Sequence, residues 1–92
     1  MSSESATLES CFTVRRPLGI HARPAGKLAT TAARFDAQVE LGRNGEWVAC
    51  TSVLSILSLA ASEGTVLDVR ASGPEAAAAL AAVGALIEAV DE

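Results

Sequence analysis

The chain has 92 residues, a formal net charge of −4 at pH 7, 50% hydrophobic residues and only 3% aromatic residues. This length predicts one domain with a thin core of Val, Leu and Ile side chains. The acidic balance excludes the basic footprint of a nucleic-acid-binding protein. No apolar run approaches the roughly 20 residues that span a bilayer, and the N-terminus lacks the basic start and apolar segment of a secretory signal. We therefore expect a cytoplasmic protein.

The two cysteines, Cys11 and Cys50, are too few and too far apart to predict a disulfide framework or a zinc site. We interpret both as small, buried, apolar side chains in a reducing compartment. The sequence predicts no metal site.

The first residues of the chain are polar and acidic. We expect residues 1–7 to form a disordered lead and residues 8–92 to form the single domain. Residues 8–15 contain a β-prone run and predict the first strand. Residues 16–19 predict a loop, because a proline there lacks an N–H donor and a glycine relaxes the backbone.

A helix is predicted to begin at His21 or Ala22. Pro24 fixes this start, because proline is tolerated in a helix only within the first turn. The following residues place apolar side chains at i, i+3, i+4 and i+7, the spacing of one helical face. These residues are Ala25, Leu28, Ala29 and Ala32. His21 therefore lies where backbone N–H groups have no partner within the helix.

A β-hairpin is predicted in the middle of the chain. Residues 37–42 alternate apolar and polar side chains, which is the pattern of a half-buried strand. Asn44 and Gly45 favour a tight turn, because both accept positive φ. Residues 47–50 are predicted to form the returning strand.

Ser52 offers an N-cap to a short second helix. This helix is too apolar for all of its large side chains to face one sheet, and Ile56 and Leu59 suit the core. The other three apolar side chains are then expected to remain exposed near His21 and to form a partner-docking surface. These residues are Val53, Leu54 and Leu57.

The last third of the chain predicts a strand and a helix. Residues 63–64 are expected to end the second helix, and residues 65–71 form the fourth strand. Residues 72–75 match a capping box with proline in the first turn of a final helix. Its apolar repeat consists of Leu80, Val83, Ile87 and Val90. The order β-α-β-β-α-β-α favours the α+β class, with all helices on one face of a sheet.

His21 is the single histidine and lies in the heptapeptide GIHARPA, residues 19–25. An imidazole at a helix N-terminus can carry a phosphoryl group on one ring nitrogen, with the helix end and Arg23 stabilising the negative charge. The backbone N–H of Ala22 is predicted to face this phosphate. A lone histidine is more often structural than functional, so the residues by themselves leave a structural role open.

Residues 18–25 resemble the active-site signature of HPr phosphocarriers of the bacterial phosphoenolpyruvate-dependent sugar phosphotransferase system. Residues 52–59 resemble the segment around the regulatory serine of that family, and residues 63–66 resemble its turn into the last strand. The likeness covers residues 9–90. It implies an open-faced β-sandwich, with a four-stranded antiparallel sheet under three helices and the strand order 1-4-2-3.

The resemblance implies that Nδ1 of His21 accepts a phosphoryl group from enzyme I and passes it to the A domain of a sugar-specific enzyme II. It implies no cofactor on the carrier, although enzyme I uses magnesium. Ser52 matches a serine that an HPr kinase phosphorylates in many bacteria, but Thr51 and Ser55 depart from the kinase-regulated pattern. We expect a monomer that does not insert into a membrane.

Three alternative functions compete with a sugar-pathway carrier. A nitrogen-type or other regulatory phosphocarrier shares the histidine chemistry but passes the phosphate to a regulatory protein. A non-catalytic α+β interaction module would make His21 incidental. A hydrolase using Cys or Ser is disfavoured, because the chain offers no acid to orient the imidazole and no oxyanion loop. Arg16 and Lys27 either steer an acidic partner or are ordinary exposed charges.

Overall fold

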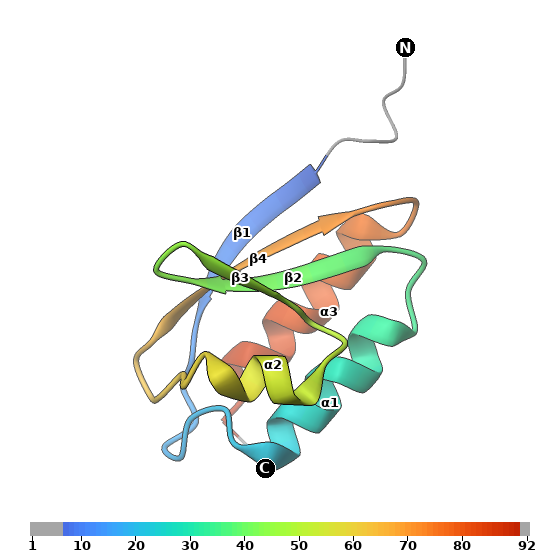
Figure 1. Cartoon of the computed structure of the whole chain (residues 1–92). Coiled ribbons are helices and arrows are strands. Elements are labelled where there is room, and N and C mark those ends of the chain that lie inside the picture. The colour runs from blue at the N-terminus through green and yellow to red at the C-terminus, as the bar shows by residue number, and fades with distance from the viewer. Residues whose placement is uncertain (1–6, 91–92) are drawn as a thin grey trace.

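The structure, a computed structural model, describes residues 7–90 as an antiparallel sheet with three helices on one of its faces (Figure 1). The elements are β1 (Thr7–Thr13), α1 (Ala22–Ala33), β2 (Gln38–Arg43), β3 (Glu46–Ala49), α2 (Val53–Ser58), β4 (Val66–Ser72) and α3 (Ala76–Glu88). The strand order is β1-β4-β2-β3. The α+β class and the strand order implied by the resemblance are both confirmed. Between residues 7 and 90, none of the helices has the length and apolar character needed to cross a bilayer.

The inner strand β4 determines which side chains face the helices. It pairs antiparallel with β1 on one side and with β2 on the other, so that Val69 lies opposite both Ser10 and Leu41. Successive strand residues point to opposite faces. Leu67, Val69 and Ala71 are therefore buried under the helices, whereas the residues between them lie on the open face.

The core between sheet and helices is built largely from small side chains. Helices α1 and α3 contribute several alanines, which let the helix backbones lie close to the sheet. The largest fully buried apolar side chains are Leu28, Leu41, Ile56, Leu67 and Ile87. Gly84 of α3 lies directly against the ring of Phe12 of β1, which fills the space that a Cβ would occupy.

The first strand is shifted from its predicted bounds. It begins at Thr7, one residue inside the predicted lead, and it ends at Thr13 instead of residue 15. Beyond Thr13 the pairing becomes irregular, because Val14 bonds to two successive residues of the α2–β4 connection, donating to Thr65 O and accepting from the N–H of Gly64, each at 2.8 Å. The rest of the predicted lead, residues 1–6, lies outside the described residues.

The predicted hairpin is confirmed, with its returning strand shifted by one residue to Glu46–Ala49. Asn44 and Gly45 have φ values of 54° and 83°. Positive φ at both central residues is typical of the turn whose twist matches a two-stranded ribbon.

The second helix begins as predicted but ends earlier. The hydroxyl oxygen of Ser52 accepts a hydrogen bond from the N–H of Ser55 at 3.2 Å, which confirms the N-cap. The helix ends at Ser58, and Ala60 adopts a left-handed conformation with φ of 53°. The prediction that residues 63–64 end it is wrong, because a non-glycine residue reverses the chain before they are reached.

The predicted capping box of the last helix is also wrong. Ser72 is the final residue of β4, and the helix starts after Glu75, whose side chain forms no capping bond. The Glu75 carboxylate instead accepts from the N–H of Asp36 at 2.7 Å. Val90 lies beyond the end of α3 and is exposed, so the buried repeat stops at Ile87.

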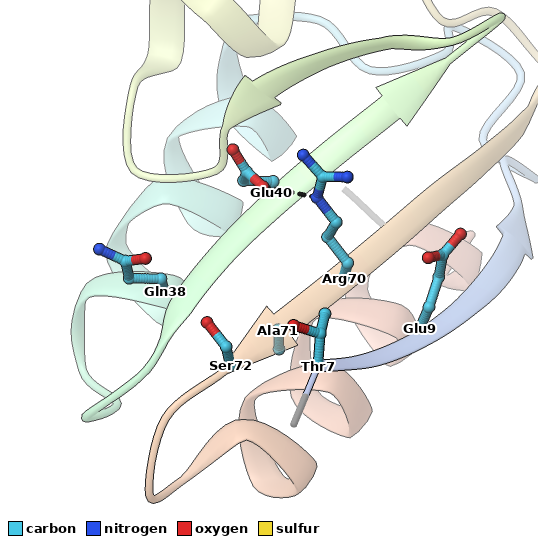
Figure 2. Close-up of a pocket in the computed structure, with 7 residues that line it drawn as sticks. All are labelled: Thr7, Glu9, Gln38, Glu40, Arg70, Ala71 and Ser72. Atoms are coloured by element: carbon cyan, nitrogen blue, oxygen red, sulfur yellow. Dashed lines mark hydrogen bonds and ion pairs between the residues drawn. The ribbon is translucent and has the colours of Figure 1, made fainter. Parts of the chain in front are cut away.

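The face of the sheet that the helices leave open is polar. Arg70 bonds through Nε to Oε1 of Glu40 at 2.6 Å, and its guanidinium carbon lies 3.9 Å from the ring centroid of Trp47. The Trp47 ring in turn covers Gly42. Figure 2 shows a hollow on this face, whose remaining lining residues are Thr7, Glu9, Gln38, Ala71 and Ser72.

The two cysteines lie in different environments. Cys50 is buried, as predicted. Cys11 is exposed on the edge strand β1, opposite Asp68, so the prediction that it is buried is wrong. Cys11 shares a strand face with Glu9, and no helix covers that face.

Candidate functional site

His21 is the N-cap residue of α1, which confirms the predicted helix start. Its backbone is extended, with φ of −90° and ψ of −166°, and its carbonyl oxygen accepts the first helical bond, from the N–H of Ala25 at 3.0 Å. The side chain makes no capping bond to the helix and is half-buried. The imidazole therefore lies at the positive end of α1, where the first backbone N–H groups have no acceptor within the helix.

The turn that leads into His21 is held against the loop between α2 and β4. Ile20 is buried, and its N–H donates to Ala61 O at 2.9 Å. Gly19 has φ of +71°, and a Cβ there would lie 2.5 Å from the same carbonyl oxygen. Only glycine meets both requirements without strain. The position of His21 thus depends on contacts with a segment about forty residues away in sequence.

Positive charge lines one exposed side of α1. Arg23 and Lys27 are exposed and four residues apart, so they lie on the same helical face. Both line a shallow groove that also includes Arg34 and Leu86. The first turn of α1 contains no acidic residue. A phosphate on His21 would therefore meet positive charge from Arg23 as well as from the helix end.

Arg16 does not belong to this exposed set. Its side chain is only 1% exposed, and Nη1 donates to Leu86 O at 2.6 Å. Both roles expected for it, steering and ordinary surface charge, are therefore wrong. A cation near the C-terminal end of a helix stabilises the carbonyl groups there, so Arg16 holds the turn before His21 against the end of α3.

Only one of the three α2 side chains predicted to be exposed and to form a docking surface is fully exposed. Leu54 is 81% exposed, whereas Val53 and Leu57 are half-buried and pack against the core. Ile56 and Leu59 are buried, as predicted. A helix of six residues has fewer than two turns, so few of its side chains point fully away from the core.

The sequence patterns did not predict that the side chain of Leu18 is exposed close to His21 in the chain. It is 75% exposed and lies three residues before His21. The sequence does contain a signal for this exposure. Leu18 is a large apolar residue in a loop with proline and glycine, and a loop has no helical or strand face that would bury it.

Ser52 is half-buried, and its hydroxyl is already used as the N-cap of α2. A phosphate at this end of a helix is electrostatically favourable. Its phosphorylation stays a prediction.

The hollow of Figure 2 lies on the open face of the sheet, and its lining includes neither His21 nor Arg23. Among residues 7–90, no three or more His, Cys, Asp and Glu side chains are grouped so as to hold a metal ion. The surroundings of His21 are thus the N-terminal end of α1 and the exposed side chain of Arg23.

Comparison with known proteins shows that the chain is similar to phosphocarriers of the phosphotransferase system. A family model described as "PTS HPr component phosphorylation site" matches residues 8–89. The chain is 38% identical over 81 residues to the phosphocarrier protein HPr of Xylella fastidiosa strain Temecula1, covering 88% of this chain and 91% of that protein. It is also 38% identical over 82 residues to the phosphocarrier protein NPr of Shewanella violacea, covering 89% of this chain and 90% of that protein.

The fold comparison agrees. The crystal structure of HPr from Bacillus anthracis matches with a TM-score of 0.86 at 30% identity, covering 90% of this chain and 99% of that one. The chain belongs to the HPr family of phosphotransferase-system phosphocarriers.

Proposed function

We propose that His21 accepts a phosphoryl group from phospho-enzyme I and passes it to the A domain of a sugar-transport enzyme II. The observation that carries this proposal is the place of His21 at the N-cap of α1, with Arg23 exposed in the first turn. Family membership supports the general carrier role.

In the transfer, Nδ1 of His21 attacks phosphorus with its lone pair as the bond between phosphorus and the donor breaks, and the donor leaves with the electron pair of that bond. The P–N bond that forms is labile, so the group retains most of its transfer potential. The N–H of Ala22 and the guanidinium of Arg23 stabilise the equatorial oxygens. A carrier needs moderate stabilisation only, and an exposed helix end with one arginine provides it.

The proposed docking surface joins apolar and cationic parts. Leu18 and Leu54 are the exposed apolar side chains, and Arg23 and Lys27 supply the positive charge. Aromatic and aliphatic contacts dominate the centre of most interfaces, while charges at the rim set the association rate. A partner that fits this surface has an apolar patch beside an acidic one.

A nitrogen-type regulatory carrier is the second candidate. It is favoured by the NPr relative, which is as similar to this chain as the HPr relative is. The two candidates share the chemistry at His21 and differ in the acceptor.

The test is a transfer assay with the phosphorylated chain and two acceptors, a sugar-type A domain and a nitrogen-type A domain. We expect rapid transfer to the sugar-type domain and transfer at least about tenfold slower to the other, which corresponds to 1.4 kcal/mol of discrimination. Faster transfer to the nitrogen-type domain would assign the chain to the regulatory pathway. Transfer to neither domain would contradict both candidates.

A further inference from the structure

We propose that Arg43 is a positioning residue for His21, which acts through the loop between α2 and β4. The inference rests on the proposed role of His21 as the phosphoryl acceptor. Arg43 is the last residue of β2 and lies outside residues 14–21, the segment that we call the histidine turn, so its effect must be transmitted through intervening hydrogen bonds and covalent links.

Arg43 binds the end of the second helix. Its Nη1 donates to Leu59 O at 2.8 Å and to Ala60 O at 2.7 Å. The last carbonyl groups of a helix have no N–H partner within it, and a cation there is favourable. Arg43 therefore fixes two successive carbonyl groups just as the chain leaves α2.

Ala60, whose carbonyl group Arg43 binds, has a disfavoured backbone conformation. Ala60 has φ of 53°, in the left-handed region, where a Cβ approaches the following carbonyl oxygen. Such conformations persist only when the surroundings hold them. The bonds from Arg43 to the carbonyl groups of Leu59 and Ala60 hold this one.

The next residue along the chain connects this turn to His21. Ala61 O accepts from the N–H of Ile20, which directly precedes His21. The other end of the histidine turn, Val14, bonds to Gly64 and Thr65 of the same loop. The α2–β4 loop thus holds both ends of the histidine turn.

These contacts form a continuous path in which each step is a hydrogen bond or a covalent link. If Ala60 left the left-handed region, the direction of the Ala61 carbonyl would change and the bond to Ile20 would be lost. A displacement of about 1 Å in a reacting group can reduce a rate by about a hundredfold.

A double-mutant cycle between Arg43 and Ala60 tests the proposal. Glycine adopts the left-handed conformation freely, so Ala60→Gly should remove the need for Arg43. We expect Arg43→Ala to lower kcat for phosphoryl uptake from phospho-enzyme I by about tenfold to a hundredfold, with KM changed less than about twofold. In Arg43→Ala with Ala60→Gly, we expect kcat within about threefold of the wild-type value. If Arg43→Ala lowers kcat and the added Ala60→Gly substitution does not restore it, the proposal is overturned.

Amide hydrogen exchange at Ile20 provides a readout that needs no phosphoryl transfer. We expect exchange at Ile20 to be about tenfold faster in Arg43→Ala and to return toward the wild-type rate in the double variant. If no variant is phosphorylated but this exchange pattern holds, the proposed function fails and the role of Arg43 in positioning the turn stands. Unchanged exchange in Arg43→Ala would overturn the proposal.

Two further variants separate positioning from folding and from charge. Arg43→Lys keeps a cation that can donate to both carbonyl groups, so we expect it to recover most of the rate even if Arg43→Ala does not fold. Arg70→Ala removes the same charge from the open face of the sheet, where Arg70 bonds Glu40, and should leave kcat and Ile20 exchange unchanged. A loss of kcat in Arg70→Ala equal to that in Arg43→Ala would overturn the proposal.

Discussion

Gly19 lies so close to Ala61 that a Cβ on the glycine would be 2.5 Å from the carbonyl oxygen of the alanine. That carbonyl oxygen also accepts the N–H of Ile20. The contact therefore joins the turn before His21 to the loop after α2. It explains why glycine is needed at this point of the motif, in addition to its φ of +71°.

Gly19→Ala is expected to destabilise the protein and to impair phosphoryl uptake. The left-handed backbone costs about 1–2 kcal/mol for a residue with a Cβ, and overpacking against Ala61 adds about 1–3 kcal/mol. The free energy of unfolding from urea denaturation measures the sum. Gly45→Ala is the matched control, because Gly45 has φ of +83° and open space around it. Equal losses in the two variants would contradict a specific contact between Gly19 and Ala61.

Gly84→Ala is expected to destabilise the packing of α3 against β1. A methyl group at Gly84 would overlap the ring of Phe12, and such overpacking costs about 1–3 kcal/mol. Gly26→Ala in α1 meets nothing within 4 Å and should stabilise the protein by about 1 kcal/mol through helix propensity. Thermal unfolding of the two variants checks the opposite signs. A stabilising Gly84→Ala would contradict the described packing.

The features that sequence predicted correctly depend on local chemistry. Pro24 located the start of α1, and Asn44 with Gly45 located the hairpin, because each residue restricts or permits particular backbone angles. Ser52 was recognised as an N-cap for the same reason.

The features that sequence missed depend on long-range packing. Arg16 is buried because the distant residue Leu86 offers it a carbonyl group, which nothing near Arg16 in sequence indicates. Cys11 is exposed because the helices cover only one face of the sheet. Helix α2 ends early, at Ser58, and the left-handed turn at Ala60 that follows is bonded by Arg43 from β2, so no local pattern marks this end.

Alkaline pH is expected to destabilise the protein through Cys50. Burial raises the pKa of the Cys50 thiol from 9.0 to about 12. Between these values the unfolded chain releases the proton while the folded chain keeps it, so the unfolded state binds fewer protons and stability falls as pH rises. The free energy of unfolding should decrease by up to about 1.4 kcal/mol per pH unit in this window.

Cysteine variants check this slope. Cys50→Ala removes the titrating group and should flatten the dependence between pH 9 and 12, even if it lowers stability overall. Cys11→Ser changes an exposed thiol and should leave the slope unchanged. The chain has no tyrosine that would titrate in the same range. A slope that persists in Cys50→Ala would refute the assignment.

Arg23→Ala is expected to slow phosphoryl uptake by about tenfold to a hundredfold. A hydrogen bond to a charged group is worth about 1.5–3 kcal/mol, and the phosphate oxygens would lose it. Arg23→Lys should retain part of the rate. Arg34→Ala at the C-cap of α1 is the control, and it should change mainly the salt dependence of association. An Arg23→Ala variant as fast as wild type would remove Arg23 from the site.

The most direct test of the central claim is the intact mass of the chain after incubation with phosphoenolpyruvate, magnesium and a bacterial enzyme I. A phosphate on an imidazole nitrogen is labile in acid, unlike one on a serine. We predict one acid-labile phosphate on the wild-type chain and none on His21→Ala, with Ser52→Ala modified like wild type. A wild-type chain that remains unmodified beside an enzyme I that phosphorylates another HPr, or a His21→Ala variant that still gains the phosphate, would contradict the account.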